Sequence, residues 1–290
     1  MWCYVGRVNE RVFSAAIPDS AGGRESLHWA YANYVGRGLV GFLAAGRRLL
    51  AFTLVTLGVF VTKLGVAPEV TFPSIRAELA RSGTRLLPMF VFMSAALGLA
   101  VIGQAISWFG NLGGTYLGTI LVVVVVRELG PLLAALLVLT HAGAHNAIEL
   151  ATTRALGEVE ALEALDIDPI HYLIVPRVAG MALGVFALTI YFILGVLGFG
   201  YLFAFLNGVA LRPGEYAVQI ANAMSGLDFV LVSIKSCLFG VTIGMITCYQ
   251  GLAQPLRLVE VSRASVKAVV HSVIACVLLD AFFILVYLLV

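Results

Sequence analysis

Long hydrophobic stretches alternate with short polar ones along most of the chain, and this alternation predicts helices that cross a membrane. A spanning helix needs about 20 predominantly apolar residues. The uncharged run from residue 86 to 126 is too long for one crossing, and the glycines of Gly110–Gly114 mark a turn within it. The pattern therefore predicts five spans, at Leu87–Phe109, Thr115–Leu139, Tyr172–Leu206, Phe229–Tyr249 and Val269–Val290.

The first 86 residues are expected to form an N-terminal cytoplasmic or interfacial segment, and residues 87–290 the transmembrane domain. Within the N-terminal segment, Leu39–Val66 is apolar but contains Arg47, Arg48 and Lys63. We expect it to form an amphipathic helix along the membrane interface, with a sixth span as the alternative. The expected fold class is an all-α polytopic membrane protein with five transmembrane helices, preceded by that interfacial helix.

Composition supports a membrane protein. Of the 290 residues, 61% are hydrophobic and 12% are charged, whereas a soluble domain has about 45–50% apolar and about 25% charged residues. The net charge of +2 gives no indication of nucleic-acid binding. Lys and Arg are frequent before Leu86, whereas the turn at Gly110–Gly114 has none. The positive-inside rule therefore predicts a cytoplasmic N-terminus and, with five spans, a C-terminus on the opposite side.

Ionisable side chains interrupt the apolar stretches at Arg127 and Glu128 in the second span, Lys235 in the fourth and Asp280 in the fifth. A charge at the centre of a spanning helix costs about 2.5–3.5 kcal/mol on insertion scales, so it persists where it faces a cavity or a partner. Two of these side chains are basic and two are acidic. We expect them to line a polar pocket inside the bundle, with Lys235 among the carboxylates.

An amphipathic helix is predicted between the second and third spans, over Arg154–Asp166. Apolar residues recur at every third position, and acidic residues occupy much of the remaining surface. Helices that rest on headgroups favour Lys and Arg on their polar face, so an acidic helix indicates a protein partner. Asp168–Pro169 is expected to end the helix, because the residue before proline disfavours the helical region.

Glycine pairs spaced four residues apart occur at Gly114/Gly118, Gly180/Gly184 and Gly240/Gly244. Such pairs favour close approach of membrane helices. They predict helix packing and indicate no specific function.

Several longer motifs occur together and in order. They are RELGPLLAALL, the block from IEL to IDPIHYLIVPR, SIKSCLFG, and the stretch from CYQG to VLLD. On these motifs the chain from Leu87 to Val290 resembles the MlaE-type (YrbE-type) permeases, the membrane subunits of ABC transporters that act with MCE proteins in lipid trafficking. The resemblance implies a multi-pass permease of the bacterial inner membrane that moves phospholipid or a similar amphiphile to or from a periplasmic MCE protein. It further implies a homodimer and a separate cytoplasmic ABC ATPase.

The resemblance also implies roles for particular residues. The pocket residues of the family match Glu128, Lys235 and Asp280, and the charge pattern adds Arg127. The segment after the second span corresponds to the helix that couples to the ATPase, with candidate residues Arg154, Leu156, Glu158, Val159, Leu162, Glu163, Leu165, Asp168 and Pro169. This sequence departs from the family pattern at His141 and at Gly157–Glu158. These positions lie at the cytoplasmic end of the second span and in the coupling helix, so the departures affect the expected details of ATPase docking.

No Walker motif occurs in the sequence, so ATP and Mg²⁺ are expected on the partner ATPase. This chain is expected to bind no cofactor or metal and to be no enzyme. Two alternatives stay open. His141, His145 and Glu149 share one helical face and have the chemistry of a zinc or iron site, as in a membrane metalloenzyme. The other is a proton-coupled secondary transporter that uses Glu128, Glu149 and Asp280, although the internal repeats typical of that class are not apparent.

Overall fold

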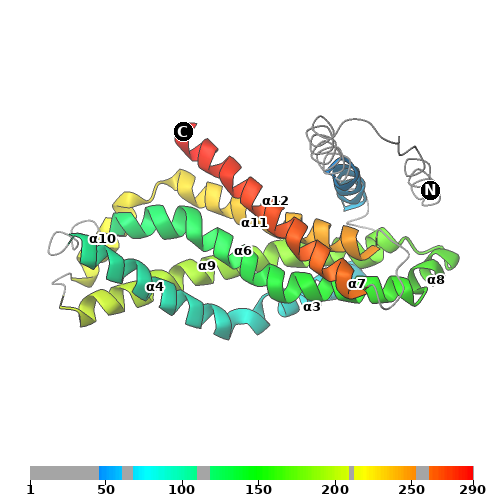
Figure 1. The fold of residues 1–290 in the computed structure, drawn as a ribbon, viewed down its shortest axis with the longest axis horizontal. Helices are drawn as coiled ribbons and strands as arrows, with labels where there is room; N and C mark the ends of the chain where they lie inside the picture. The colour runs from blue at the N-terminus through cyan, green and yellow to red at the C-terminus, as the bar shows by residue number, and fades with distance from the viewer. Residues whose placement is uncertain (1–45, 61–67, 110–117, 209–211, 253–260, 290) are drawn as a thin grey trace, which may run out of the picture. The chain divides into compact units, whose positions relative to one another are not determined.

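The computed structural model describes residues 46–60, 68–109, 118–208, 212–252 and 261–289, and all regular structure within these ranges is helical (Figure 1). The chain divides into two compact units, Met1–Arg48 and Leu49–Val290. The first unit lies almost entirely outside the described residues. The second contains all the helices that Figure 1 labels.

Five helical stretches are long and apolar enough to cross a membrane: Phe72–Trp108, Gly118–Ala155, Ile170–Leu206, Gly226–Leu252 and Val261–Leu289. The predicted all-α class and the five spans are therefore confirmed. The first span is built from α3 (Pro68–Ser82), the 3₁₀ turn η1 (Thr84–Leu86) and α4 (Leu87–Phe109). The second is built from the π-helix η3 (Val122–Leu129), α6 (Gly130–Val138), the π-helix η4 (Leu139–Gly143) and α7 (Ala144–Ala155). The third is built from the π-helix η5 (Ile170–Ile174) and α9 (Val175–Leu206), and the fourth and fifth are α11 (Gly226–Leu252) and α12 (Val261–Leu289). Two short helices, α8 (Glu158–Ala164) and α10 (Pro213–Ala223), lie in connections between spans.

The spans extend beyond the predicted hydrophobic runs. The second continues past Leu139 through α7, and the fifth begins at Val261, so that Arg263 and Lys267 belong to its first turns. Helix α3 occupies a stretch for which no helix is predicted. The reason is that hydropathy detects only the apolar part of a helix, whereas backbone hydrogen bonding continues into its polar ends.

Helix α9 lies at the centre of the bundle and packs against α3, α4, α6 and α11, while α12 packs against α11 and α7. Two predicted glycine pairs lie at close contacts between helices. A Cβ atom added to Gly240 would lie 2.5 Å from the Cα atom of Ala182, and one added to Gly184 would lie 2.5 Å from the Oγ atom of Ser82. These pairs therefore serve helix packing, as predicted, whereas Gly114 lies outside the described residues.

Helices α8 and α10 lie at opposite ends of the bundle (Figure 1). Tyr216 anchors α10, because its hydroxyl donates a hydrogen bond of 2.9 Å to the carbonyl oxygen of Leu197 in α9. Burial raises the pKa of the Tyr216 phenol well above its usual value, so the hydroxyl stays protonated.

Only residues 46–60 of the segment Leu39–Val66 are described, and they form a helix. Phe52 in this helix packs edge-on against Tyr249 of α11, with ring centroids 5.5 Å apart. The helical conformation is thus observed for this part of the segment. Its location along the membrane interface stays a prediction.

Candidate functional site

A group of charged side chains lies between η3, α11 and α12, and we call it the lysine cluster. Lys235 of α11 is fully buried at its centre. Its Nζ atom lies 3.0 Å from Oε2 of Glu128 and 2.8 Å from Oδ1 of Asp280. The structure therefore brings together Glu128, Lys235 and Asp280, three of the four residues predicted to line a polar pocket. The full cluster consists of Arg127, Glu128, Asp228, Lys235 and Asp280.

The ammonium group of Lys235 also donates to the backbone carbonyl of Arg127, over 3.0 Å. In an α-helix this carbonyl would accept from the N–H of residue 131. Residue 131 is proline, which has no N–H to donate. Pro131 therefore leaves the carbonyl without its α-helical donor, and the lysine supplies one. The sequence RELGP in this way sets both a carboxylate and a carbonyl around Lys235.

Arg127 pairs with Asp228, which was not predicted to be a site residue. Its Nε atom lies 3.0 Å from Oδ1 of Asp228, and its Nη2 atom donates to Oδ2 over 3.1 Å. Asp228 also accepts from the backbone N–H of Ser225 over 2.8 Å, and Ser225 Oγ accepts from the N–H of Asp228. This is a capping box at the start of α11. The pattern Ser-x-x-Asp is visible in the sequence, but it indicates a helix start and no arginine partner.

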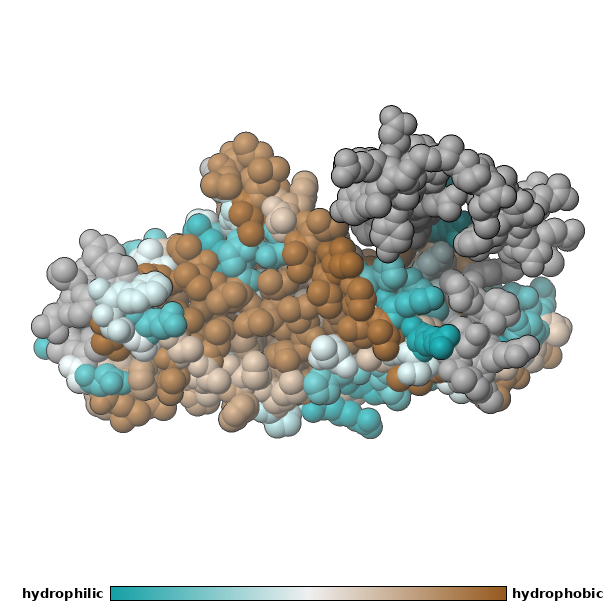
Figure 2. Space-filling model, in the orientation of Figure 1, coloured by the Kyte–Doolittle hydropathy of each residue, from teal (hydrophilic) through white to brown (hydrophobic). Residues whose placement is uncertain are grey.

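The lysine cluster is partly open on one side. The side chains of Arg127 and Glu128 are each 31% exposed, whereas that of Asp280 is 12% exposed and that of Lys235 is closed off. Figure 2 shows a hydrophilic area beside the C-terminal turns of α12, bordered by hydrophobic residues. The ring of Tyr287 on α12 lies 5.7 Å from the guanidinium of Arg127. Charged groups are thus accessible beside an apolar surface.

A second group, which we call the arginine cluster, joins α3, α7 and α9. Glu149 of α7 binds Arg81 at 2.9 Å and Arg177 at 2.8 Å. Arg81 also binds Glu78 at 2.8 Å, and Asn146 donates to Glu78 over 2.6 Å. Two arginines balance two glutamates, so this cluster is neutral. Its geometry indicates a structural connection among the three helices.

The histidines do not combine with Glu149 into a metal site. His145 is 62% exposed and its Nε2 atom lies 3.8 Å from Glu149, whose carboxylate already faces two arginines. His141 contacts the carbonyl of Leu137. Within the described ranges, no group of three His, Cys, Asp or Glu side chains is arranged to hold a metal ion. The geometry therefore gives the metalloenzyme alternative no support.

The predicted continuous helix Arg154–Asp166 is interrupted. Helix α7 ends at Ala155, and Gly157 adopts a left-handed conformation with φ of 77° before α8 begins at Glu158. Glycine reaches this conformation without the steric cost that a side chain would bring. Helix α8 also ends earlier than Asp168–Pro169, because Asp166 has a φ of 59° and turns the chain. The acidic helix is therefore a short element set off from α7.

The apolar positions of this segment divide between the bundle and the outside. Val159 is buried, whereas Leu156 is 59% exposed and Leu165 is 70% exposed. The acidic residues Glu158, Glu160, Glu163 and Asp166 are exposed as well. The segment thus presents an acidic surface with projecting leucines, held to the bundle by Val159.

The other candidate residues of this segment take part in its local structure. Arg154 pairs with Glu160 at 3.4 Å. Asp168 accepts a hydrogen bond from the N–H of Ile170 over 3.1 Å, and Pro169 directly precedes η5.

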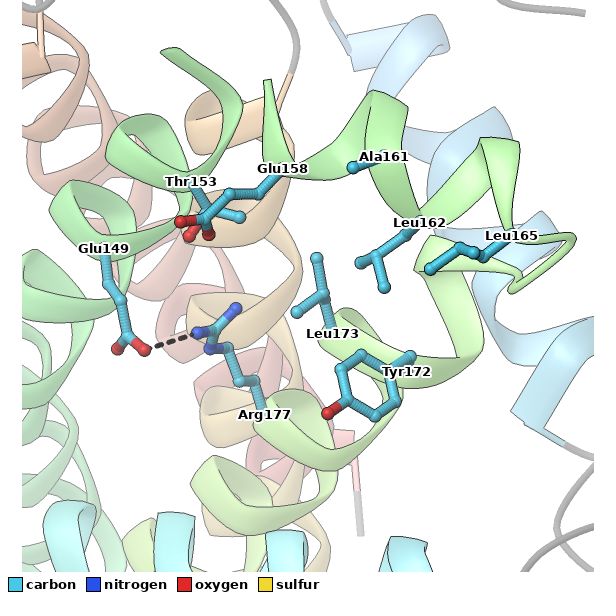
Figure 3. A pocket seen from close by; sticks show the side chains of 9 residues that line it. All are labelled: Glu149, Thr153, Glu158, Ala161, Leu162, Leu165, Tyr172, Leu173 and Arg177. Atoms are coloured by element: carbon cyan, nitrogen blue, oxygen red, sulfur yellow. Dashed lines mark ion pairs between the residues drawn. The ribbon is translucent and has the colours of Figure 1, made fainter. Parts of the chain in front are cut away.

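A pocket of about 370 Å³ lies next to α8. Figure 3 shows Leu162 pointing toward Leu173 and Tyr172, with the ion pair of Glu149 and Arg177 on the opposite side. The pocket therefore combines apolar walls with a charged one, next to the exposed surface of α8.

The fold and the two clusters define a multi-pass membrane protein with charges held between its helices. The chain belongs to the MlaE permease family, because the family model described as Permease MlaE matches residues 75–286. Membership confirms the resemblance seen in the sequence. It makes the chain a membrane-embedded permease subunit of the ABC transporter type, and such subunits work with a separate ATPase.

Individual relatives agree with this assignment. A probable ABC transporter permease protein of Rickettsia prowazekii is 31% identical over 209 residues, which cover 71% of this chain and 80% of the relative. A probable ABC transporter permease protein of Rickettsia typhi is 28% identical over 243 residues, covering 83% and 91%. The chloroplastic protein TRIGALACTOSYLDIACYLGLYCEROL 1 of Arabidopsis thaliana is 27% identical over 254 residues, covering 87% and 68%.

Proposed function

We propose that this chain is the permease subunit of an ABC transporter that moves phospholipid or a similar amphiphile between the bacterial inner membrane and a periplasmic MCE protein. The lysine cluster carries this proposal. An amphiphile needs polar contacts for its headgroup and an apolar surface for its acyl chains. The exposed edges of Arg127 and Glu128 offer the first, and exposed apolar side chains of η3 and α12, such as Val123, Val124 and Leu285, offer the second. The name of the Arabidopsis relative, which contains that of a glycolipid, supports a lipid substrate.

The proposal assigns the two ends of the bundle to different partners. The acidic surface of α8 faces the cytoplasm and docks on the ATPase, which binds ATP and Mg²⁺. The end that carries α10 faces the periplasm and the MCE protein, and the chain works as a homodimer. The N-terminus is then cytoplasmic and the C-terminus periplasmic, in agreement with the distribution of Lys and Arg along the sequence.

The test is to purify the protein after co-expression with the genes that neighbour its own, and to identify bound lipid and subunits by mass spectrometry. We expect an ATPase, an MCE-domain protein and phospholipid, and transfer of labelled phospholipid that requires ATP. A protein that carries stoichiometric metal without an ATPase would instead favour the metalloenzyme. A complex that contains the ATPase but no lipid would refute the lipid substrate.

Replacing Leu165 with arginine is expected to weaken ATPase binding about tenfold or more, as for an apolar residue at the centre of an interface. Leu165 is 70% exposed and makes little contribution to the core, so the permease should remain folded. The measurement is the amount of ATPase that co-purifies. Leu206→Arg is the matched control, because Leu206 is 72% exposed at the end of α9, near α10. Equal ATPase recovery with both variants would count against docking on α8.

A further inference from the structure

The lysine cluster contains more negative than positive groups. Glu128, Asp228 and Asp280 carry three negative charges, and Arg127 and Lys235 carry two positive ones, which leaves one negative charge. Arg127 and Asp228 neutralise each other, so the excess lies with Lys235 and its two carboxylates. The arginine cluster, by contrast, is balanced. Of the two clusters, the partly open lysine cluster is therefore the one with a net charge.

The lysine at the centre of the cluster is already engaged. A lysine ammonium has three hydrogen-bond donors. Lys235 donates to Glu128 and to the carbonyl of Arg127, its Nζ atom lies 2.8 Å from Oδ1 of Asp280 as an ion pair, and no part of the side chain is exposed. The guanidinium of Arg127 faces both oxygens of Asp228. Lys235 is therefore closed to an incoming phosphate or carboxylate, whereas Arg127 is 31% exposed and uses only part of its five N–H donors on Asp228.

The acidic groups, in contrast, have acceptor capacity to spare. Lys235 contacts Oε2 of Glu128, and no hydrogen bond from another described residue reaches Oε1. The Glu128 side chain is 31% exposed, so part of this carboxylate is open to the outside. The hydroxyl of Tyr287 is buried and has no hydrogen-bond partner within the described part of the chain. The accessible edge of the cluster thus offers the negatively charged acceptor of Glu128 beside the guanidinium of Arg127.

We infer that the lysine cluster selects amphiphiles whose headgroup carries a positively charged ammonium group, such as ethanolamine phospholipids. This inference rests on the proposed function, since it requires the headgroup to enter this site. The ammonium group would donate to Glu128 and offset the negative charge there, while the phosphate of the same headgroup would face the exposed guanidinium of Arg127. A headgroup without a cation would leave that charge uncompensated in an apolar environment, where an unpaired charge is unfavourable. The site therefore discriminates by charge complementarity.

The test measures which of two lipids the purified full-length protein retains. The protein is incubated in detergent with an equimolar mixture of dioleoyl phosphatidylethanolamine and dioleoyl phosphatidylglycerol, and bound lipid is quantified by native mass spectrometry. We expect the ethanolamine lipid to be retained about tenfold more than the glycerol lipid, as for one hydrogen bond to a charged group. Glu128→Gln should bring the ratio close to one. Glu215→Gln, which removes the same charge from an exposed position in α10, should keep the wild-type ratio.

Asp280→Asn is a second variant for the same test, because it removes one negative charge from the other carboxylate that pairs with Lys235. It should lower the ratio as Glu128→Gln does, and it decides the question if Glu128→Gln does not fold. Equal or greater retention of the glycerol lipid by the wild type would contradict the inference, as would an unchanged ratio in the folded variants. If both lipids bind without discrimination, only the headgroup inference fails. If neither binds, the lipid-transport proposal fails with it.

Discussion

Replacing Lys235 with methionine is expected to lower the free energy of unfolding by about 3 kcal/mol, the lower end of the cost of removing one partner from a buried ion pair. Methionine keeps a similar length and removes the charge. Two carboxylates from two other helices then lose their common partner, as does the carbonyl of Arg127. The partial exposure of Glu128 lets water reach one carboxylate, which is why the lower end of the range applies. Thermal unfolding of the purified protein in detergent measures the effect.

The matched control is Lys267→Met. Lys267 is exposed in the first turns of α12 and should change the free energy of unfolding by no more than about 0.5 kcal/mol. Adding Asp280→Leu to Lys235→Met should recover part of the loss, because one of the unpaired carboxylates disappears. If Lys235→Met unfolds at the same temperature as Lys267→Met, the lysine cluster does not stabilise the bundle.

Part of the lysine cluster could be predicted from the sequence, because a charged side chain within an apolar run persists only where it faces a cavity or a charged partner. The insertion cost alone indicates that Glu128, Lys235 and Asp280 face one another. The partner of Arg127 could not be predicted in this way. Asp228 lies at the start of α11, where a carboxylate has an ordinary role as a cap. Which side chain meets Arg127 depends on the alignment of η3 against α11, and that alignment is a property of the packed bundle.

The arginine cluster, in contrast, could not be predicted from the sequence. Glu78 lies in a polar stretch that hydropathy leaves outside the spans, yet it is only 1% exposed. Its burial follows from α3 packing against α9, where Gly180 leaves room for the Glu78 side chain: a Cβ atom added to Gly180 would lie 2.6 Å from the Cβ atom of Glu78. A polar helix that packs into a bundle has no hydrophobic signature. Its place could therefore be found only from the tertiary contacts.

The second large effect is expected at the contact between α9 and α11. Replacing Gly240 with valine should destabilise the bundle by about 3 kcal/mol or more, the upper part of the usual cost of overpacking. A Cβ atom at this position would lie 2.5 Å from the Cα atom of Ala182 and 2.7 Å from the carbonyl oxygen of Met181. Both are backbone atoms, so no side-chain rotation relieves the clash and the two helices must move apart.

Gly198→Val is the matched control, because nothing lies within 4 Å of a Cβ atom added to Gly198 of α9. Thermal unfolding should separate the two variants, with Gly240→Ala between them. The same displacement should reach the lysine cluster, since Lys235 lies on α11 one and a half turns before Gly240 and its contacts with Glu128 and Asp280 depend on the position of that helix. We therefore expect the folded fraction of Gly240→Ala to lose bound lipid as well as stability. Wild-type stability of Gly240→Val would show that α9 and α11 do not pack as closely as the structure indicates.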